Sequence, residues 1–194
     1  MRCFSDLVRL TACAVLLVSC ALSPVAASQA QVPARAGTVK VLGNFSGVKH
    51  AHGDAFGYAL DLWKEGGRVF GLLLVYTGPP ADPPTGILED VKFDPRSGQL
   101  SFSARLSTGI VYSRGYSGVP SRDRFTFKGV LKRTQVIGTL TRSNELFPSE
   151  RPRSEKVRLR RSEVLTQVMI PPPETYTAWK NWADEILRRR GPKW

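Results

Sequence analysis

Residues 55–76 read AFGYALDLWKEGGRVFGLLLVY, and this stretch decides the fold. Apolar residues occupy every second position of its first half, from Phe56 through Tyr58 to Leu62. An alternation with a period of two places one side of a strand on a core and the other in water, as in antiparallel sheets. The glycines of residues 65–67 then supply a tight turn into a second strand. The chain is therefore predicted to be all-β.

The same alternation and the same kind of turn recur along the chain. They predict eight strands, at residues 39–48, 55–64, 68–76, 87–94, 99–106, 124–131, 135–142 and 156–161. Short connections alternate with long ones at 49–54, 77–86, 107–123 and 143–155. If consecutive strands pair, every short turn lies at one end of the sheet and every long loop at the other. This predicts an eight-stranded antiparallel up-and-down barrel, or alternatively a two-sheet sandwich with the same strand order.

Strand 68–76 differs from the others because it is apolar on both sides. A patch of that size is rarely left in water, so a cover is expected. Residues 174–190 place Tyr176, Trp179 and Ala183 at helical spacing after Pro173. We expect this C-terminal helix to pack outside the barrel against strand 68–76, with Trp179 as its anchor and Trp182 beside it.

This layout resembles that of the calycins, the group that includes lipocalins and avidins. The similarity covers residues 39–190 and consists of eight meandering strands, long loops at the mouth, and a helix after the last strand. Lipocalins carry Gly-x-Trp on the first strand, where this chain has Gly43-Asn44-Phe45, and an arginine on the last strand, for which Arg158 or Arg160 is the counterpart here. The resemblance implies binding of a small, mostly apolar molecule.

The N-terminus has the pattern of an export signal. A basic start and a short apolar run, too short to span a bilayer, precede small residues over positions 1–27. Residues 17–20 resemble a bacterial lipobox, which implies cleavage before Cys20 and its lipidation, whereas residues 25–27 resemble an ordinary signal-peptidase site. Residues 28–38 are predicted to be a flexible tether and 39–194 a single domain. We expect a periplasmic or outer-membrane lipoprotein, or a secreted protein.

Positive charge is concentrated in the second half of the chain. The whole chain has a formal net charge of +12, yet residues 31–95 hold six Lys and Arg against seven acids. Residues 96–194 hold twenty Lys and Arg against eight acids. Such a half attracts polyanions and anionic membrane surfaces, which outside the cytoplasm are lipid headgroups, acidic glycans or lipopolysaccharide. The alternative is that the charge only keeps the domain soluble. No nucleic-acid-binding motif accompanies the charge, so nucleic acid is not the expected partner.

The long connection 107–123 is the candidate ligand site. It combines Ser, Thr and Gly with Tyr112, Arg114, Tyr116 and Arg122. Tyrosines provide rigid amphipathic contact area, and arginines bind carboxylates or phosphates through two parallel hydrogen bonds. Long loops at a barrel mouth are common recognition sites. The alternative is a loop whose tyrosines fold back on the barrel rim.

A second candidate is a metal site at His50, His52 and Asp54. Alternate residues of an extended segment point to the same side, so two imidazoles and a carboxylate would converge on zinc or copper. The alternative is a polar hairpin turn built on Gly53 and Asp54, because turns select such residues without any ligand.

Three functions follow from these patterns. The first is a noncatalytic exported envelope protein that binds a small apolar or amphipathic anion at a barrel mouth. The second is a structural module that docks on anionic envelope surfaces and has no ligand cavity. The third is a weak metal-dependent activity at His50, His52 and Asp54. No nucleophile, phosphate-binding or dinucleotide motif is found, so no enzyme and no cofactor is expected.

Overall fold

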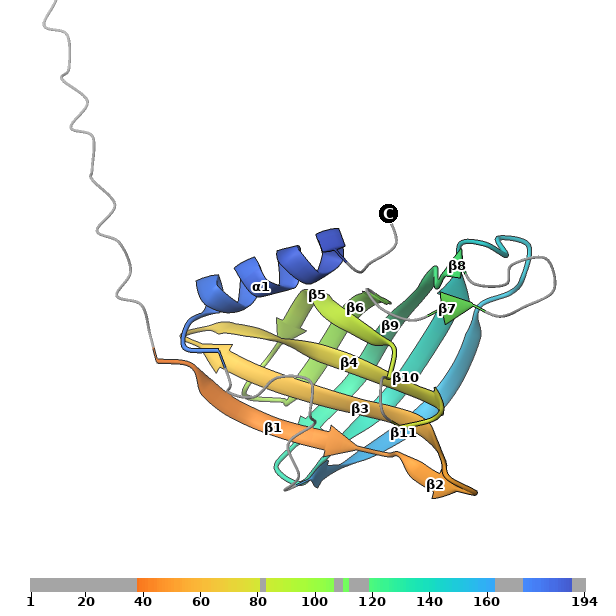
Figure 1. Cartoon of the computed structure of the whole chain (residues 1–194). Helices are drawn as coiled ribbons and strands as arrows, with labels where there is room; N and C mark the ends of the chain where they lie inside the picture. Colours follow the sequence, from red (N-terminus) through yellow and green to blue (C-terminus); the bar gives the residue numbers. More distant parts are fainter. Residues whose placement is uncertain (1–37, 81–82, 107–109, 112–118, 163–172, 190–194) are drawn as a thin grey trace, which may run out of the picture. The chain divides into compact units, whose positions relative to one another are not determined.

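The computed structural model describes residues 38–80, 83–106, 110–111, 119–162 and 173–189. Its elements, coloured in chain order in Figure 1, are β1 (Lys40–Ser46), β2 (Lys49–Ala51), β3 (Asp54–Glu65), β4 (Arg68–Gly78), β5 (Thr85–Phe93), β6 (Gln99–Leu106), β7 (Ile110–Val111), β8 (Val119–Pro120), β9 (Asp123–Lys132), β10 (Gln135–Asn144), β11 (Arg153–Ser162) and α1 (Tyr176–Arg189). All eight predicted strands are confirmed. The short strands β2, β7 and β8 fall in connections that were predicted as loops.

The sheet closes on itself and forms an eight-stranded antiparallel barrel. Its strand order is β1-β11-β10-β9-β6-β5-β4-β3, and β1 pairs with β11 on one side and with β3 on the other. Phe45 of β1, for example, lies opposite Arg161 on β11 and opposite Leu60 on β3. The closed ladder therefore establishes the barrel and rules out the sandwich. Strand β2 pairs with β3 alone and lies outside the barrel.

Connection length separates the two ends of the barrel, as predicted. The β3–β4, β5–β6 and β9–β10 turns lie at one end, and the longer connections lie at the other. Gly66 in the first turn has φ 57° and Gly98 in the second has φ 72°. These left-handed conformations suit glycine, which has no Cβ to collide with the backbone. The glycines thus fix tight turns and, through them, the closed base.

The interior of the barrel is filled by its own side chains. The largest fully buried members of this core are Phe45, Leu60, Leu62, Leu73, Leu100, Leu106, Phe125, Phe127 and Val136. The rings of Phe102 and Phe127 stack with centroids 5.0 Å apart. A Cβ at Gly129 or Gly138 would come within 2.6 Å of the Phe127 ring, so both glycines leave room for it. An eight-stranded barrel has an interior of a size that side chains can fill, and here they do.

Arg161 closes the base of the barrel. Its guanidinium lies over the Phe45 ring, 5.1 Å from the centroid. The same group donates hydrogen bonds to the carbonyl oxygens of Arg133 at 2.7 Å and Leu42 at 2.6 Å. The last-strand arginine that faces the first-strand aromatic is therefore Arg161, not Arg158 or Arg160. Alternation from Val157 and Leu159 places Arg161 on the inner side of β11, whereas Arg158 and Arg160 lie on the outer side and face water.

The C-terminal helix packs on the outside of the barrel, over β3, β4 and β5 (Figure 1). Trp179 is 3 % exposed, and its ring centroid lies 5.0 Å from that of Phe70 on β4. Trp182 is partly buried against the same cluster. Thr175 caps the helix by accepting a hydrogen bond from the Ala178 N–H at 3.0 Å, so the helix starts two residues later than predicted. The predicted cover and its anchor are confirmed.

Two residues of β3 depart from the predicted alternation. Phe56 was expected to face the core, yet it is 46 % exposed because β3 extends past the barrel wall to pair with β2. Asp61 lies on the polar side of the alternation, yet it is 1 % exposed and accepts a hydrogen bond from Asn44 Nδ2 at 2.6 Å. The outer side of β3 is therefore covered and not exposed to water.

No helix in the described residues is long and apolar enough to cross a membrane.

Candidate functional site

The predicted loop site lies mostly outside the described residues. Tyr112, Arg114 and Tyr116 belong to the segment 112–118, which the structure does not describe. Arg122 is described: it is half-buried just before β9, and its carbonyl oxygen accepts a hydrogen bond from the Glu145 N–H at 3.1 Å. The ligand site at these four residues therefore stays a prediction. Cys20 also lies outside the described residues, and its lipidation stays a prediction.

The predicted metal ligands occupy a β-hairpin. His52 (φ 53°) and Gly53 (φ 89°) form a two-residue turn with two positive φ angles, as in a type I′ turn. Ala51 pairs with Asp54, and His50 pairs with Ala55. Because successive side chains alternate between the two faces of a ribbon, His50 and Asp54 point to opposite faces. Among the described residues no group of three His, Cys, Asp or Glu is placed to hold a metal, so the hairpin gives this prediction no support.

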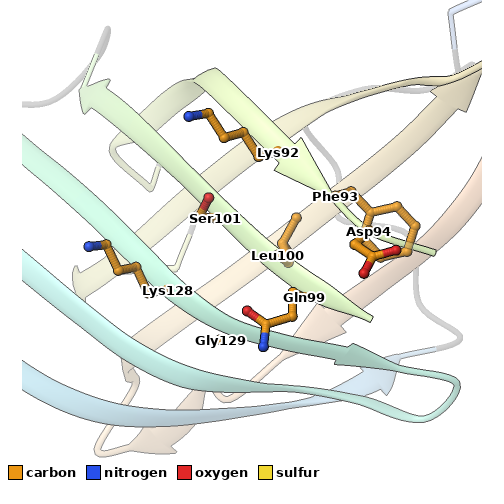
Figure 2. A pocket seen from close by; sticks show the side chains of 8 residues that line it. All are labelled: Lys92, Phe93, Asp94, Gln99, Leu100, Ser101, Lys128 and Gly129. Atoms are coloured by element: carbon orange, nitrogen blue, oxygen red, sulfur yellow. The ribbon is translucent and has the colours of Figure 1, made fainter. Parts of the chain in front are cut away.

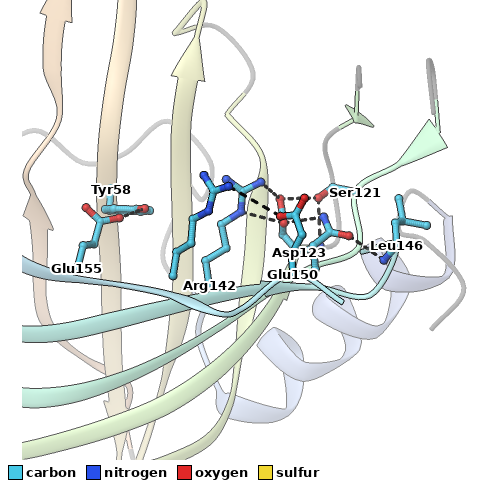
Figure 3. Close-up of polar contacts among 9 residues, drawn as sticks. Tyr58, Ser121, Asp123, Arg142, Leu146, Glu150 and Glu155 are labelled. Carbon is cyan, nitrogen blue, oxygen red and sulfur yellow. Dashed lines mark hydrogen bonds and ion pairs between the residues drawn. The ribbon is translucent and has the colours of Figure 1, made fainter. Parts of the chain in front are cut away.

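A polar cluster around Asp123 occupies the mouth end of the barrel (Figure 3). Arg142 binds the Asp123 carboxylate through two hydrogen bonds, Nε to Oδ1 and Nη2 to Oδ2, each 2.9 Å long. Asn144 Nδ2 donates to Oδ1 at 2.8 Å, and Ser121 Oγ donates to Oδ2 at 3.0 Å. Asp123 is nearly buried, whereas the side chain of Arg142 is 49 % exposed. Every hydrogen-bonding direction of the carboxylate is thus used.

This cluster anchors the loop that follows β10. Asn144 uses its side-chain oxygen to accept a hydrogen bond from the Leu146 N–H at 2.8 Å while its nitrogen bonds Asp123. The connections before β9 and after β10 are thereby fastened to the strand ends. Since Asp123 already neutralises Arg142, the cluster offers neither a general base nor an unpaired cation. Sequence reasoning missed it because the predicted strands began at residue 124 and ended at residue 142. They therefore left out Asp123 at the start of β9 and Asn144 at the end of β10.

Tyr58 and Glu155 form a second polar contact at the mouth, also drawn in Figure 3. The Tyr58 hydroxyl donates a hydrogen bond to Glu155 Oε1, which links β3 to β11. Burial raises the pKa of the Tyr58 phenol well above its usual range, and the hydrogen bond to Glu155 adds to this effect. The phenol is therefore held neutral as a donor and is not an activated acid or base at neutral pH.

The outer side of β9, β10 and β11 carries a different kind of surface. Phe125, Phe127, Val157 and Leu159 face the core, so the residues between them face outward. We call the six exposed cations among these outward residues the basic face: Arg124, Lys128 and Lys132 on β9, and Lys156, Arg158 and Arg160 on β11. The outward residues of β10 between them are uncharged: Gln135, Ile137, Thr139, Thr141 and Ser143.

The charges of the basic face are not compensated locally. The described outward positions of β9, β10 and β11 include no acidic residue. Within the described part of the chain, none of the six cations forms an ion pair. By contrast, Arg105 on the neighbouring strand β6 is paired with Glu89, with Nη2 and Oε1 2.6 Å apart. The basic face is thus an exposed block of one sign, which produces a field that reaches into solvent.

A groove of about 420 Å³ adjoins the basic face on β5, β6 and β9 (Figure 2). Lys92 and Lys128 stand on either side of Ser101, because Ser101 pairs with Lys92 on one side and with Lys128 on the other. The small serine between two long side chains leaves the surface hollow. Gln99 and Asp94 complete its wall toward the β5–β6 turn. The polar lining of the groove therefore consists of two cations, a hydroxyl, an amide and the carboxylate of Asp94.

The predicted strand order already placed strands 124–131 and 156–161 on either side of strand 135–142, and alternation predicts that Lys128, Arg158 and Arg160 face water. The register that sets these cations opposite particular residues of β10 is a property of the folded barrel. Comparison with known proteins adds no further assignment: no family model, no curated protein and no solved structure gives a significant match to this chain.

Proposed function

We propose that this chain is a noncatalytic, exported envelope protein that docks on anionic surfaces or polymers through its basic face. The single observation that carries the proposal is the block of six exposed cations with no acid among the described outward positions of β9, β10 and β11. Such a surface attracts polyanions over a Debye length and binds them without first breaking ion pairs of its own.

The filled interior favours surface docking over a ligand held in the lumen. A cavity for an apolar ligand requires space between the inward side chains, yet Phe102, Phe125 and Phe127 are buried among the aliphatic residues of the core. At the mouth, the described polar groups already bind one another, as in the pair of Asp123 and Arg142. Ligand binding at the loop 107–123 is the alternative, and no contact of the described residues supports it.

The test compares two variants that each lose three positive charges. Lys156→Gln/Arg158→Gln/Arg160→Gln removes the β11 half of the basic face. Lys40→Gln/Lys49→Gln/Arg96→Gln removes three exposed cations from β1, β2 and the β5–β6 turn as a matched control. Binding is measured by cosedimentation with phosphatidylcholine vesicles containing phosphatidylglycerol, and by retention on immobilised dextran sulfate, over a range of NaCl concentrations.

The first variant is expected to lose about a hundredfold in affinity, because each cation near an anionic surface contributes about 1 kcal/mol. It should also show a weaker dependence on salt, whereas the control should stay close to the unmodified protein. Equal losses in the two variants would mean that net charge alone drives binding. In that case the basic face is not the docking site.

Processing at the N-terminus is tested by the denatured mass of the protein purified from its own envelope. The export proposal predicts one of two results: a chain that starts at an acylated Cys20, or a chain that starts at Ser28 without lipid. A mass that retains residues 1–19 would contradict export through this signal.

A further inference from the structure

One cross-strand row of the barrel alternates lysines and hydroxyl side chains over five strands. Lys92 on β5 pairs with Ser101 on β6, and Ser101 pairs with Lys128 on β9. Lys128 pairs with Thr139 on β10, and Thr139 pairs with Lys156 on β11. We call these five residues the lysine row. All of its lysines and Thr139 are exposed, and Ser101 lines the groove between Lys92 and Lys128 (Figure 2).

The spacing of the row gives it a repeat. Neighbouring strands lie about 4.8 Å apart, so successive lysines of the row stand about 10 Å apart at the backbone, with a hydroxyl midway between them. The outward curvature of the barrel spreads the lysine tips further, and the flexible four-carbon stems can take up that difference. The row thus presents a cation, a neutral hydrogen-bonding group and a cation again, in a line that crosses the strands.

This repeat matches an extended acidic glycan better than a lipid bilayer. Two sugar rings of an extended chain span nearly the distance between successive lysines, and each ring displays hydroxyls that Ser101 or Thr139 can bind. A bilayer is flat and fluid and has no repeat that would favour one row of cations over another. The row also contains no apolar or aromatic side chain to insert among lipids.

We propose that the lysine row binds a linear acidic polysaccharide with one anionic group per disaccharide, with the chain running across the strands from β5 to β11. Each anionic group lies at a lysine, and the uncharged sugars between them lie over Ser101 and Thr139. This inference rests on the proposed function, because it names the polymer that the basic side of the barrel would bind and extends the contact beyond the basic face to Lys92.

Among the described residues that line the groove, Asp94 is the one carboxylate. It already accepts hydrogen bonds from the Ser97 hydroxyl at 2.6 Å and from the Arg96 N–H at 2.9 Å, within the β5–β6 turn. These bonds hold the pKa of Asp94 below its usual range, so it is ionised at neutral pH. The donors of both hydrogen bonds belong to the turn, so they hold the carboxylate there. The charges of Lys92 and Lys128 outweigh that of Asp94 and leave the groove with a net positive charge.

The test uses oligosaccharides of equal charge and different charge spacing. The first probe is a hexasaccharide of alternating glucuronate and N-acetylglucosamine, with one carboxylate per disaccharide. The second is an oligogalacturonate with the same number of carboxylates, one on every ring. Affinity is measured by isothermal titration calorimetry at low salt, alongside dextran sulfate and the phosphatidylglycerol vesicles. The variants are Lys92→Gln/Lys128→Gln/Lys156→Gln in the row and Lys132→Gln/Arg158→Gln/Arg160→Gln outside it.

The row variant is expected to lose about tenfold more affinity for the alternating hexasaccharide than the off-row variant does. For dextran sulfate and vesicles the two variants should lose affinity equally. Thr139→Val, which removes the hydroxyl and keeps the shape, should lower the affinity for the hexasaccharide and leave binding to the vesicles unchanged. Equal losses of the hexasaccharide in both variants would overturn the lysine row as its site.

Other outcomes separate this inference from the proposed function. Tighter binding of the oligogalacturonate than of the alternating hexasaccharide would overturn the spacing argument. Binding to vesicles without binding to either oligosaccharide would overturn the glycan and leave docking on anionic surfaces intact. If the protein binds none of the four probes at low salt, both the inference and the proposed function are wrong.

Discussion

Two parts of the barrel wall carry opposite kinds of outer surface. Over β3, β4 and β5 the outer side is apolar and covered by α1, with Leu72, Leu74 and Ile87 buried beneath the helix. Over β9, β10 and β11 the outer side is uncovered and carries the basic face. Both parts share one core on their inner side. The difference shows that the inward side chains hold the barrel together, whereas the outward side chains of each part can be used either to pack a helix or to bind a partner.

The largest difference between the two sides should appear when an apolar side chain is truncated on each. Trp179→Ala removes the helix anchor and is expected to lower the free energy of unfolding by about 3–5 kcal/mol. Ile137→Ala on the outer side of β10 should cost at most about 1 kcal/mol, because its side chain is only half-buried. Urea-induced unfolding followed by circular dichroism measures both. Similar losses would mean that α1 does not stabilise the covered side.

Trp179 also allows a sharper version of this test. Its indole N–H is buried and has no hydrogen-bond partner in the described part of the chain. A buried donor without an acceptor is costly, so Trp179→Phe removes a penalty together with some packing. We expect Trp179→Phe to be clearly less destabilising than Trp179→Ala in the same urea experiment. Equal losses would indicate that the indole N–H is satisfied.

The next effect concerns polar groups on the two outer sides. Asn44→Ala leaves the buried Asp61 carboxylate without the donor that lies 2.6 Å from it, at a cost of about 1–3 kcal/mol. Thr126→Ala on the uncovered side of β9 removes an exposed hydroxyl and should change stability by less than about 0.5 kcal/mol. Thermal unfolding at neutral pH separates the two outcomes. A small loss for Asn44→Ala would show that the other contacts of Asp61 are enough to satisfy its carboxylate.

A negative charge introduced into the lysine row should affect stability and binding in opposite directions. Thr139→Glu places a carboxylate directly between Lys128 and Lys156, and each cross-strand pair of opposite charge contributes about 0.2–1 kcal/mol. The variant should therefore be as stable as the unmodified protein or slightly more stable, yet bind dextran sulfate more weakly. Thr126→Glu, whose neighbours Ser103 and Thr141 are uncharged, is the control and should lose less affinity.

The smallest expected effect is a loss of stability at alkaline pH, caused by Tyr76 on the covered side. Burial raises the pKa of Tyr76, and the charge of Asp61 adds to the rise. An unfolded tyrosine ionises near pH 10, whereas the folded one keeps its proton to higher pH. The stability due to Tyr76 is therefore fully present below about pH 10 and declines as pH rises above it. Tyr76→Phe should make the loss of unfolding free energy above pH 10 less steep. An unchanged slope would exclude Tyr76 as its source.

Much of this fold followed from local patterns in the sequence. The two-residue period around Phe127 and Leu159 identified strands and their inner sides, and glycines such as Gly66 marked the tight turns. The doubly apolar strand 68–76 indicated that something must cover it, and the spacing of Trp179 in the C-terminal helix supplied the cover. These features are readable because each depends on residues that are close in sequence or on the burial of apolar surface.

The polar contacts of the barrel were much less predictable. Asp61 looked like a surface carboxylate, since an alternating strand does not reveal which of its sides another element will cover. Asp123 and Arg142 are 19 residues apart, and they meet only because β9 and β10 each run slightly beyond their apolar pattern. The hairpin at His52 shows the reverse case: spacing suggested convergence, and the pairing register separated the side chains.

By itself the sequence determined the all-β class, the positions of the eight strands, the two kinds of connection and the helix that covers one outer side. Period, turn chemistry and apolar content act over short distances and leave a direct trace in the chain. Tertiary structure alone decided that the sheet closes through β1, that Arg161 seals the base, and that Lys92, Lys128 and Lys156 share one row. Register between distant strands is set by the packing of the whole core, and no local pattern encodes it.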